Sequence, residues 1–344
     1  MPEKRSPLKR HLLTLAKLLV GGLIIGWLAW QAQQNDKFHE LASGQKNWGV
    51  LGLAFLGACL TAGLSFVRWR LVALAAGVPL SIGEALRLGA LGYTLNFVSP
   101  GSVGGDVFKA AVLARDRPGR RTAAITTIVV DRGLALVSFM ISAAVAFLVL
   151  WAIGTPMPAD ARAAGWIAVS LAVVVPCGLA VLFAPGVVTP ALVGRVELLL
   201  AVGGLLSQIL MTWADYRRGF RWLAAAFGLC VVGHLLLVTS FYLVAKGLPF
   251  SSPDWLEHAF IVPFACLSGA IPIFPAGLGA VEGTLAYAYQ WFGAEPGNGA
   301  FVAFGYRLAT VAVAFITAPY YLTHQALVKR ALADVDIEPP PEPA

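Results

Sequence analysis

The sequence predicts an all-α integral membrane protein with about six full transmembrane helices and two oppositely oriented re-entrant helical hairpins, arranged as an inverted repeat. Of its 344 residues, 58% are hydrophobic and only 12% are charged, whereas soluble domains carry roughly 25% charged residues. Several apolar windows reach the roughly 20 residues that a helix needs to cross a bilayer core. Two stretches rich in proline and glycine, each followed by an acidic residue, interrupt this pattern.

The apolar windows predict six spans, at 12–30, 48–67, 133–151, 164–184, 222–245 and 300–322. We interpret the first as a retained span and not as a signal peptide, because its apolar part exceeds roughly 7–15 residues and no A-x-A cleavage site follows. The four cysteines lie in apolar segments without metal-type spacing. They predict no disulfide framework and no metal site, and no other cofactor is expected.

The placement of Lys and Arg predicts the orientation of the spans. One set of loops carries most of the basic residues: Lys4, Arg5, Lys9, Arg10, Arg68, Arg70, Arg115, Arg117, Arg120, Arg121, Arg195, Arg217, Arg218, Arg221, Lys329 and Arg330. The opposite loops hold Lys37, Lys46, Arg162 and Lys246. This asymmetry predicts a multi-pass protein of the cytoplasmic (inner) membrane with both termini in the cytoplasm.

The first hairpin follows from this orientation. Arg68 and the cluster that begins at Arg115 are expected on one side, so the largely apolar segment between them must enter the membrane and return. Residues 82–98 and 103–114 would form its two arms, joined at a tip that contains Pro100 and Gly101. Irregular backbone at membrane depth is tolerated only where protein buries it or water reaches it, so this hairpin implies a cavity.

A second hairpin is predicted over 256–292, which the stretch IPIFPAGLGAVEG interrupts. It would enter from the outer side. SPGSVGGD and FPAGLGAVE each place an acid, Asp106 or Glu282, in the first turn of a new helix. Paired broken helices of opposite orientation are typical of transporters built from inverted repeats, whose sites lie at the breaks.

These elements define the predicted domain organisation. Residues 1–11 form a basic cytoplasmic N-terminus and 12–324 a single polytopic transmembrane domain. Within that domain, 48–151 form the first half, 193–220 an amphipathic connector lying on the membrane surface, and 222–322 the second half. Residues 325–344, which are acidic and rich in proline, form a partly disordered cytoplasmic tail.

Charged residues inside predicted membrane segments are the candidate functional groups, because such residues are costly and usually face a bundle interior. Glu84 with Arg87 and Asp106 with Lys109 stand three residues apart, the spacing at which helix side chains meet. Glu282 and Arg307 are expected to pair across helices. Glu84 and Arg87 also fit a pair at headgroup level, and the adjacent Asp131 and Arg132 also fit the cytoplasmic boundary of the apolar run that follows them.

Around Asp106 the residues predict a seat for an anion or a phosphate. The first-turn N–H groups of a helix and the side chain of Lys109 attract negative charge, and Gly104 and Gly105 would let a headgroup approach the main chain. Asn96 would line the same cavity. The simpler alternative for Asp106 and for Glu282 is a first-turn acid that stabilises its helix, and Glu282 also fits a role in proton coupling.

Four motifs carry a resemblance to a known family: NFVSPGSVGGDVFK at 96–109, VVDRGLAL around Arg132, FPAGLGAVEG around Glu282 and YRLAT around Arg307. Over roughly residues 10–325 the chain resembles the flippase-like membrane domain of lysylphosphatidylglycerol synthases. The matching positions are Asn96, Pro100, Gly101, Gly104, Gly105, Asp106, Arg132, Pro275, Gly277, Gly279, Glu282 and Arg307. The family often has Arg where this chain has Lys109, which keeps the charge but removes the bidentate fork.

The resemblance implies a role in moving or presenting lipids. In bifunctional relatives a soluble domain transfers an aminoacyl group to a phospholipid, and this sequence shows no room for such a domain, so we expect no enzymatic activity and no catalytic residues. We predict a flippase-like transporter that moves a phospholipid or isoprenoid-type lipid between leaflets of the cytoplasmic membrane. Its expected partners are membrane lipids with an anionic or lipid-linked headgroup, and no nucleic acid.

The sequence also allows three alternative functions. One is a proton-coupled secondary transporter of a small polar solute, and another is an accessory membrane subunit for a lipid-modifying transferase. The third is an intramembrane enzyme, which the sequence disfavours because it shows no carboxylates with metal spacing and no nucleophile beside a histidine.

Overall fold

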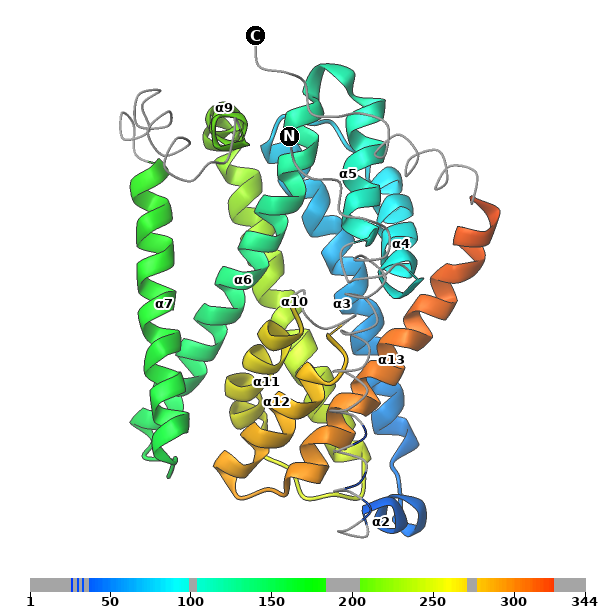
Figure 1. The fold of residues 1–344 in the computed structure, drawn as a ribbon, viewed down its shortest axis with the longest axis vertical. Coiled ribbons are helices and arrows are strands. Elements are labelled where there is room, and N and C mark those ends of the chain that lie inside the picture. Colours follow the sequence, from blue (N-terminus) through cyan, green and yellow to red (C-terminus); the bar gives the residue numbers. More distant parts are fainter. Residues whose placement is uncertain are drawn as a thin grey trace, which may run out of the picture.

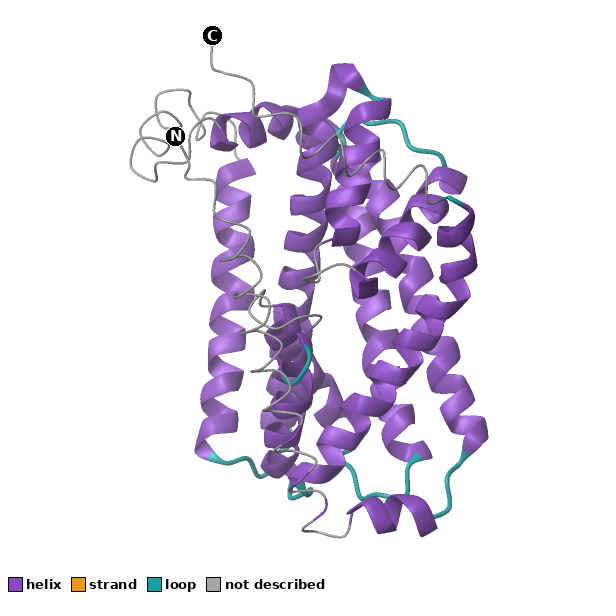
Figure 2. Ribbon diagram, turned by 45° about the vertical axis from the view of Figure 1, so that its right-hand side comes forward, coloured by secondary structure: helices purple, strands orange, loops and turns teal. Residues whose placement is uncertain are grey.

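A computed structural model describes residues 37–98, 104–183, 205–270 and 277–324, together with Gly26, Trp30 and Gln33. Every regular element in these ranges is a helix (Figure 2), which confirms the predicted all-α membrane fold. Five of the described helices are long and apolar enough to cross a membrane. They are α3 (Trp48–Ala75), α6 (Arg121–Ala152), α7 (Ala159–Phe183), α10 (Phe220–Gly247) and α13 (Pro296–Thr323). The predicted span at 12–30 lies outside the described residues except for Gly26 and Trp30.

Two pairs of shorter helices lie apart from each other, one in the upper part of the molecule and one in the lower part (Figure 1). The first pair is α4 (Ile82–Val98) with α5 (Gly104–Asp116), in the upper half, and the second is α11 (Trp255–Ala270) with α12 (Ala280–Tyr289), in the lower half. Two helices continue beyond these pairs in short 3-10 turns, η1 (Pro118–Arg120) and η3 (Gln290–Phe292). A short helix, α2 (Lys37–Ser43), precedes α3.

Two of the long helices extend well past their predicted spans. The α3 helix continues to Ala75, so Arg68 and Arg70 lie inside a helix, and their assignment to a loop is wrong. The α6 helix begins at Arg121, so Asp131 and Arg132 lie within it. Hydropathy ends a predicted span at the first charge, but a helix continues through a charged residue whose side chain finds a partner.

The central helices α3 and α10 pack along each other, and the other contacts are arranged equivalently around them. We call α3, α4, α5 and α6 the first half of the molecule and α10, α11, α12 and α13 the second half. If each helix is replaced, in this order, by its counterpart in the other half, the same pairs of helices are in contact. For example, α5 packs on α6 as α12 packs on α13, and α4 packs on α13 as α11 packs on α6. As a result, α6 and α13 each contact both short helix pairs.

Glycine contacts hold each short pair together at its inner end. A Cβ atom added to Gly105 would lie 1.9 Å from the carbonyl oxygen of Gly92, and one added to Gly277 would lie 2.9 Å from the Cα atom of Gly269. Small residues of this kind let membrane helices approach closely. The space beside the Cα atom of Gly105 is therefore filled by α4, so this glycine serves helix packing.

Between the two halves, the predicted connector at 193–220 contains the helix α9 (Leu205–Arg218). Figure 1 shows α9 end-on, whereas the long helices run roughly vertically. Asp215 accepts a hydrogen bond from Arg120 at 2.9 Å, and Tyr216 is buried. These contacts hold α9 across the ends of α3 and α6.

Candidate functional site

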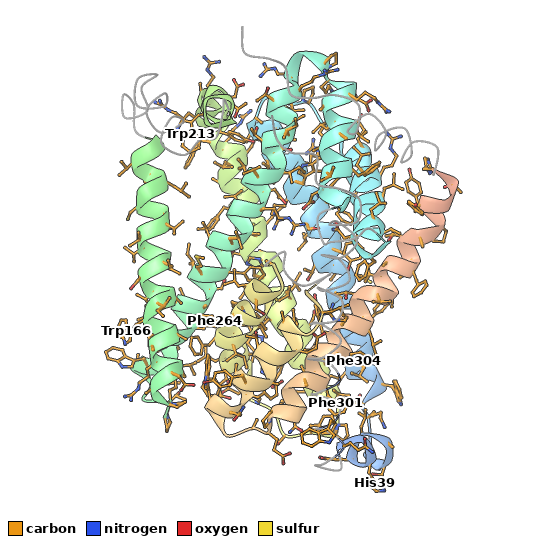
Figure 3. The ribbon with its side chains drawn as sticks, in the orientation of Figure 1. His39, Trp166, Trp213, Phe264, Phe301 and Phe304 are labelled. Atoms are coloured by element: carbon orange, nitrogen blue, oxygen red, sulfur yellow. The ribbon has the colours of Figure 1, made fainter. Side chains whose placement is uncertain are left out.

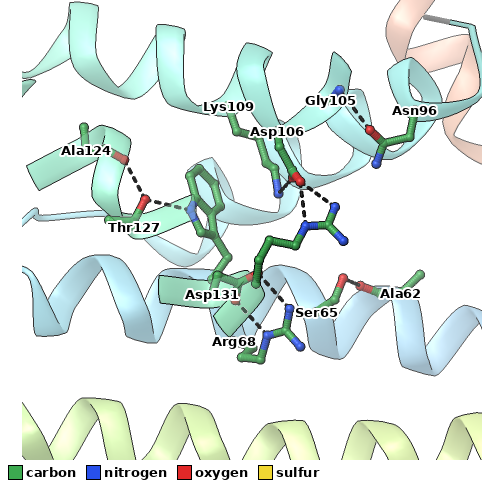
Figure 4. Close-up of polar contacts among 12 residues, drawn as sticks. Ala62, Ser65, Arg68, Asn96, Gly105, Asp106, Lys109, Ala124, Thr127 and Asp131 are labelled. Carbon is green, nitrogen blue, oxygen red and sulfur yellow. Dashed lines mark hydrogen bonds and ion pairs between the residues drawn. The ribbon is translucent and has the colours of Figure 1, made fainter. Parts of the chain in front are cut away.

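Asp106 occupies the centre of a charged cluster at the beginning of α5 (Figure 4). Its Oδ1 atom lies 2.8 Å from Nζ of Lys109, which confirms the predicted pairing along the helix face. Its Oδ2 atom accepts a hydrogen bond from Nε of Arg132 on α6 at 2.7 Å, and Nη2 of the same guanidinium also contacts this oxygen. Only 6% of the Asp106 side chain is exposed, so this carboxylate is a buried group held by two cations.

A second ion pair lies beside this one, between α3 and α6. Nε and Nη2 of Arg68 donate to Oδ1 and Oδ2 of Asp131, both at 2.7 Å, in a bidentate arrangement (Figure 4). Arg68 also contacts Sγ of Cys230 on α10 at 3.3 Å. Adjacent residues on a helix point in different directions, so Asp131 and Arg132 serve different partners and do not form a pair with each other.

Two further side chains fix the position of this cluster. The Oδ1 atom of Asn96 on α4 accepts the N–H of Gly105 at 2.9 Å, so it satisfies one of the first N–H groups of α5. Nζ of Lys109 lies 5.1 Å from the ring centroid of Trp69, a cation–π distance. The Trp69 indole N–H in turn donates to Oγ1 of Thr127 at 3.1 Å. Contacts from α3, α4 and α6 thus hold the acid and its lysine.

The other half of the molecule contains a corresponding pair. Oε1 of Glu282 accepts a hydrogen bond from Nε of Arg307 on α13 at 2.5 Å, as predicted for these two residues. Its Oε2 atom accepts the N–H of Gly279 at 2.9 Å and closes the first turn of α12. Nη2 of Arg307 also donates to the carbonyl oxygen of Gly277 at 3.2 Å. Gly277 and Gly279 have φ values of 66° and 82°, a left-handed conformation that glycine adopts readily.

The two acid–arginine pairs occupy equivalent places in the pattern of helix contacts. Asp106 and Glu282 are each the third residue of the second helix in a short pair. Their arginines follow 26 and 25 residues later, on α6 and α13. Each pair therefore joins the inner end of a short helix to a long helix that also contacts the other short pair.

The remaining predicted site residues fall into two groups. Gly104 is the first residue of α5, whereas Pro100, Gly101 and Pro275 lie outside the described residues. Outside the predicted site, Glu84 forms its ion pair with Arg117 at 3.4 Å, not with Arg87, and it accepts the backbone N–H of Ser81. This surface pair belongs to the beginning of α4 and has no contact with the Asp106 cluster.

Sequence reasoning missed two features of the site. Arg68 was assigned to a loop, although the apolar pattern VRWRLVALA that surrounds it indicates a continuing helix. The polar contacts between α4 and α13 were also missed: Oγ1 of Thr94 lies 2.7 Å from Oγ1 of Thr317, and the Tyr93 hydroxyl donates to the carbonyl oxygen of Thr310 at 3.3 Å. Isolated threonines in apolar segments carry no pairing signal, so only the fold reveals this contact.

A comparison with protein families shows to which family the chain belongs. The model of the lysylphosphatidylglycerol synthase TM region matches residues 14–318. The chain belongs to this family. The match covers both charged clusters, four of the five long helices described and all but the last residues of α13. It gives this multi-pass membrane protein a role related to membrane lipids. No curated protein matches the chain at a significant level.

Proposed function

We propose that the protein is a flippase-like transporter that moves a phospholipid or isoprenoid-type lipid between leaflets of the cytoplasmic membrane. The observation that carries the proposal is the presence of two acid–arginine pairs with buried carboxylates, Asp106–Arg132 and Glu282–Arg307. They lie at the inner ends of the two short helix pairs, one in the upper and one in the lower part of the fold (Figure 1). Buried charges in a membrane protein mark a path for polar groups. Membership of a lipid-related family makes a lipid headgroup the natural cargo.

The architecture of the proposed transporter is an inverted repeat of two re-entrant hairpins. The equivalent contacts of α3–α6 and α10–α13 support this arrangement, as do the positions of the two short pairs in opposite halves. In this proposal both termini lie in the cytoplasm, and α9 lies on the cytoplasmic membrane surface, where its Arg217 and Arg218 face anionic headgroups.

Rocking of one half against the other provides the translocation step. The helices α6 and α13 each contact both short pairs, so a shift of either helix moves one acid–arginine pair relative to the other. The headgroup passes between the two clusters, while its acyl chains remain in the bilayer. A charged headgroup needs counter-charges along a path of low dielectric. In this proposal the headgroup takes the place of a carboxylate on an arginine, and the carboxylate binds the arginine again when the headgroup leaves.

Neutralising either carboxylate is expected to slow translocation at least tenfold. Asp106→Asn and Glu282→Gln keep side-chain shape but remove the negative charge that balances the arginine. The arginine would then hold a passing headgroup more tightly and release it more slowly. The measurement is the rate at which a fluorescent phospholipid becomes accessible to a membrane-impermeant quencher in proteoliposomes, with and without a pH gradient. Wild-type movement that requires the gradient would instead favour the proton-coupled transporter.

The matched control is Glu84→Gln. It removes a carboxylate of the surface pair with Arg117, whose side chains are 34% and 29% exposed, and it should leave the rate unchanged. Unchanged rates in both Asp106→Asn and Glu282→Gln, with folded protein in the membrane, would contradict the proposal. In that case the role of an accessory subunit for a lipid-modifying transferase would become the better account.

A further inference from the structure

The two acid–arginine pairs are equivalent in position but differ in their surroundings. Three residues after Asp106 stands Lys109, whose ammonium group holds the carboxylate at 2.8 Å. Three residues after Glu282 stands Leu285, which is fully buried. One carboxylate thus has a second cation beside it, where the other has a hydrocarbon side chain.

A further difference appears at the residue before each arginine. Asp131 precedes Arg132 and binds Arg68 on α3, whereas Tyr306 precedes Arg307 and stacks on Phe241 of α10 with ring centroids 4.1 Å apart. The α3–α6 contact corresponds to the α10–α13 contact in the exchange of the two halves. An ion pair in the first half is therefore replaced by two stacked aromatic rings in the second.

These differences leave the two clusters with different charge. The first cluster contains three cations, Arg68, Lys109 and Arg132, and two carboxylates, Asp106 and Asp131, so its net charge is one positive unit. In the second cluster, Glu282 and Arg307 balance each other as far as the described residues show. A surplus charge in surroundings of low dielectric attracts an opposite charge more strongly than it would in water.

The surplus cation of the first cluster is also the accessible one. The side chain of Arg132 is 55% exposed, compared with 14% for Lys109 and 6% for Asp106. Lys109 can continue to neutralise Asp106 while the guanidinium of Arg132 turns to another anion. Guanidinium groups bind phosphate oxygens in a bidentate manner, which makes a phosphate oxyanion the fitting ligand.

We propose that the Asp106–Lys109–Arg132 cluster is a binding site for a phosphate oxyanion with net negative charge, and that the Glu282–Arg307 pair is not. The phosphate replaces the Asp106 carboxylate on Arg132, and Lys109 makes this exchange favourable by retaining Asp106. This inference rests on the proposed function only for the source of the phosphate, a lipid headgroup. A free phosphate ion shares the chemistry, and the experiment separates the two sources.

The chain offers a matched pair of lysines for the test. Lys109 lies over the ring of Trp69 at 5.1 Å, and Lys246, outside the cluster, lies over the ring of Tyr242 at 5.3 Å. Lys109→Leu copies the second half of the molecule, Lys109→Arg restores the charge, and Lys246→Leu removes one cation elsewhere. The full chain in a neutral detergent is titrated with phosphatidylglycerol, phosphatidylcholine or inorganic phosphate, and the shift of its unfolding temperature gives an apparent Kd.

For the wild type we expect an apparent Kd for phosphatidylglycerol about tenfold lower than for phosphatidylcholine, because only the former carries an uncompensated phosphate charge. Lys109→Leu should abolish this preference, whereas Lys109→Arg and Lys246→Leu should retain it. Equal protection by inorganic phosphate alone would assign the site to a soluble anion.

Three results would overturn the inference. They are no preference in the wild type, the same preference in Lys109→Leu as in the wild type, and an equal loss of preference in Lys246→Leu, since overall charge would then explain the binding. The titration needs no transport. If phosphatidylglycerol binds as expected but no lipid crosses the bilayer in proteoliposomes, the proposed function fails while the binding site stands.

Discussion

Replacing Arg68 with alanine is expected to destabilise the protein by about 3–5 kcal/mol, the range found when one partner of a buried ion pair is removed. The Asp131 carboxylate, whose side chain is 7% exposed, would be left buried without its bidentate partner. The pair joins α3 to α6 within the first half, so its loss also weakens the contact between these two helices. Thermal unfolding in detergent measures the effect as a large fall in the midpoint temperature.

Two companion variants test the origin of this loss. Arg68→Met combined with Asp131→Leu removes both charges and should recover most of the stability, because apolar side chains of similar volume often replace a buried pair without cost. Arg117→Ala removes the exposed pair with Glu84 and should cost about 0–1 kcal/mol. An Arg68→Ala protein that unfolds at the wild-type temperature would show that this ion pair does not stabilise the fold.

Replacing Arg307 with alanine is expected to loosen the beginning of α12 rather than the whole molecule. Arg307 binds both the Glu282 carboxylate and the carbonyl oxygen of Gly277, so its loss leaves a carboxylate with 5% exposure unpaired. We expect amide hydrogen exchange over 277–289 to accelerate at least tenfold, since local opening then costs less free energy. Arg307→Lys should give an intermediate rate, because lysine keeps the charge but has a single donor group.

The exchange experiment contains its own control. Peptides from α5, which carries the equivalent acid Asp106, should exchange at the wild-type rate in Arg307→Ala, because the two clusters share no hydrogen bond among the described residues. Unchanged exchange over 277–289 would mean that the arginine does not anchor this helix. Faster exchange throughout the chain would instead indicate a role in global stability.

The sequence predicted those parts of the fold that depend on local patterns. Hydropathy located the five long helices that the structure describes, because a span of apolar residues has no stable alternative in a bilayer. The breaks around Pro100 and Pro275 located the two short helix pairs, and the i, i+3 spacing located Asp106 with Lys109. Glu282 and Arg307 were also paired correctly, since a buried charge in a membrane needs a partner and few candidates were left.

The contacts that depend on the packing of distant helices were predicted poorly. Arg68 and Asp131 are 63 residues apart, and neither local spacing nor hydropathy relates them. Positive charges near a predicted span are usually loop residues, so the orientation rule assigned Arg68 to a loop. The packing role of Gly105 was not predicted either, because only the three-dimensional structure shows that Gly92 fills the space beside it.

The central claim is that the two halves move against each other during lipid translocation, and the contact between α4 and α13 allows a direct test. The Oγ1 atoms of Thr94 and Thr317 lie 2.7 Å apart, one in each half. Thr94→Cys combined with Thr317→Cys, in a background with the four native cysteines replaced by alanine, would place two thiols within reach of a disulfide. Each single-cysteine variant serves as the control.

The decisive measurement is the rate of lipid translocation by this double-cysteine protein in proteoliposomes, first oxidised and then reduced. We predict that oxidation stops translocation and that a reductant restores it in the same vesicles, while both single-cysteine variants are unaffected. Translocation at the same rate before and after reduction, with the disulfide shown to be formed, would contradict the account.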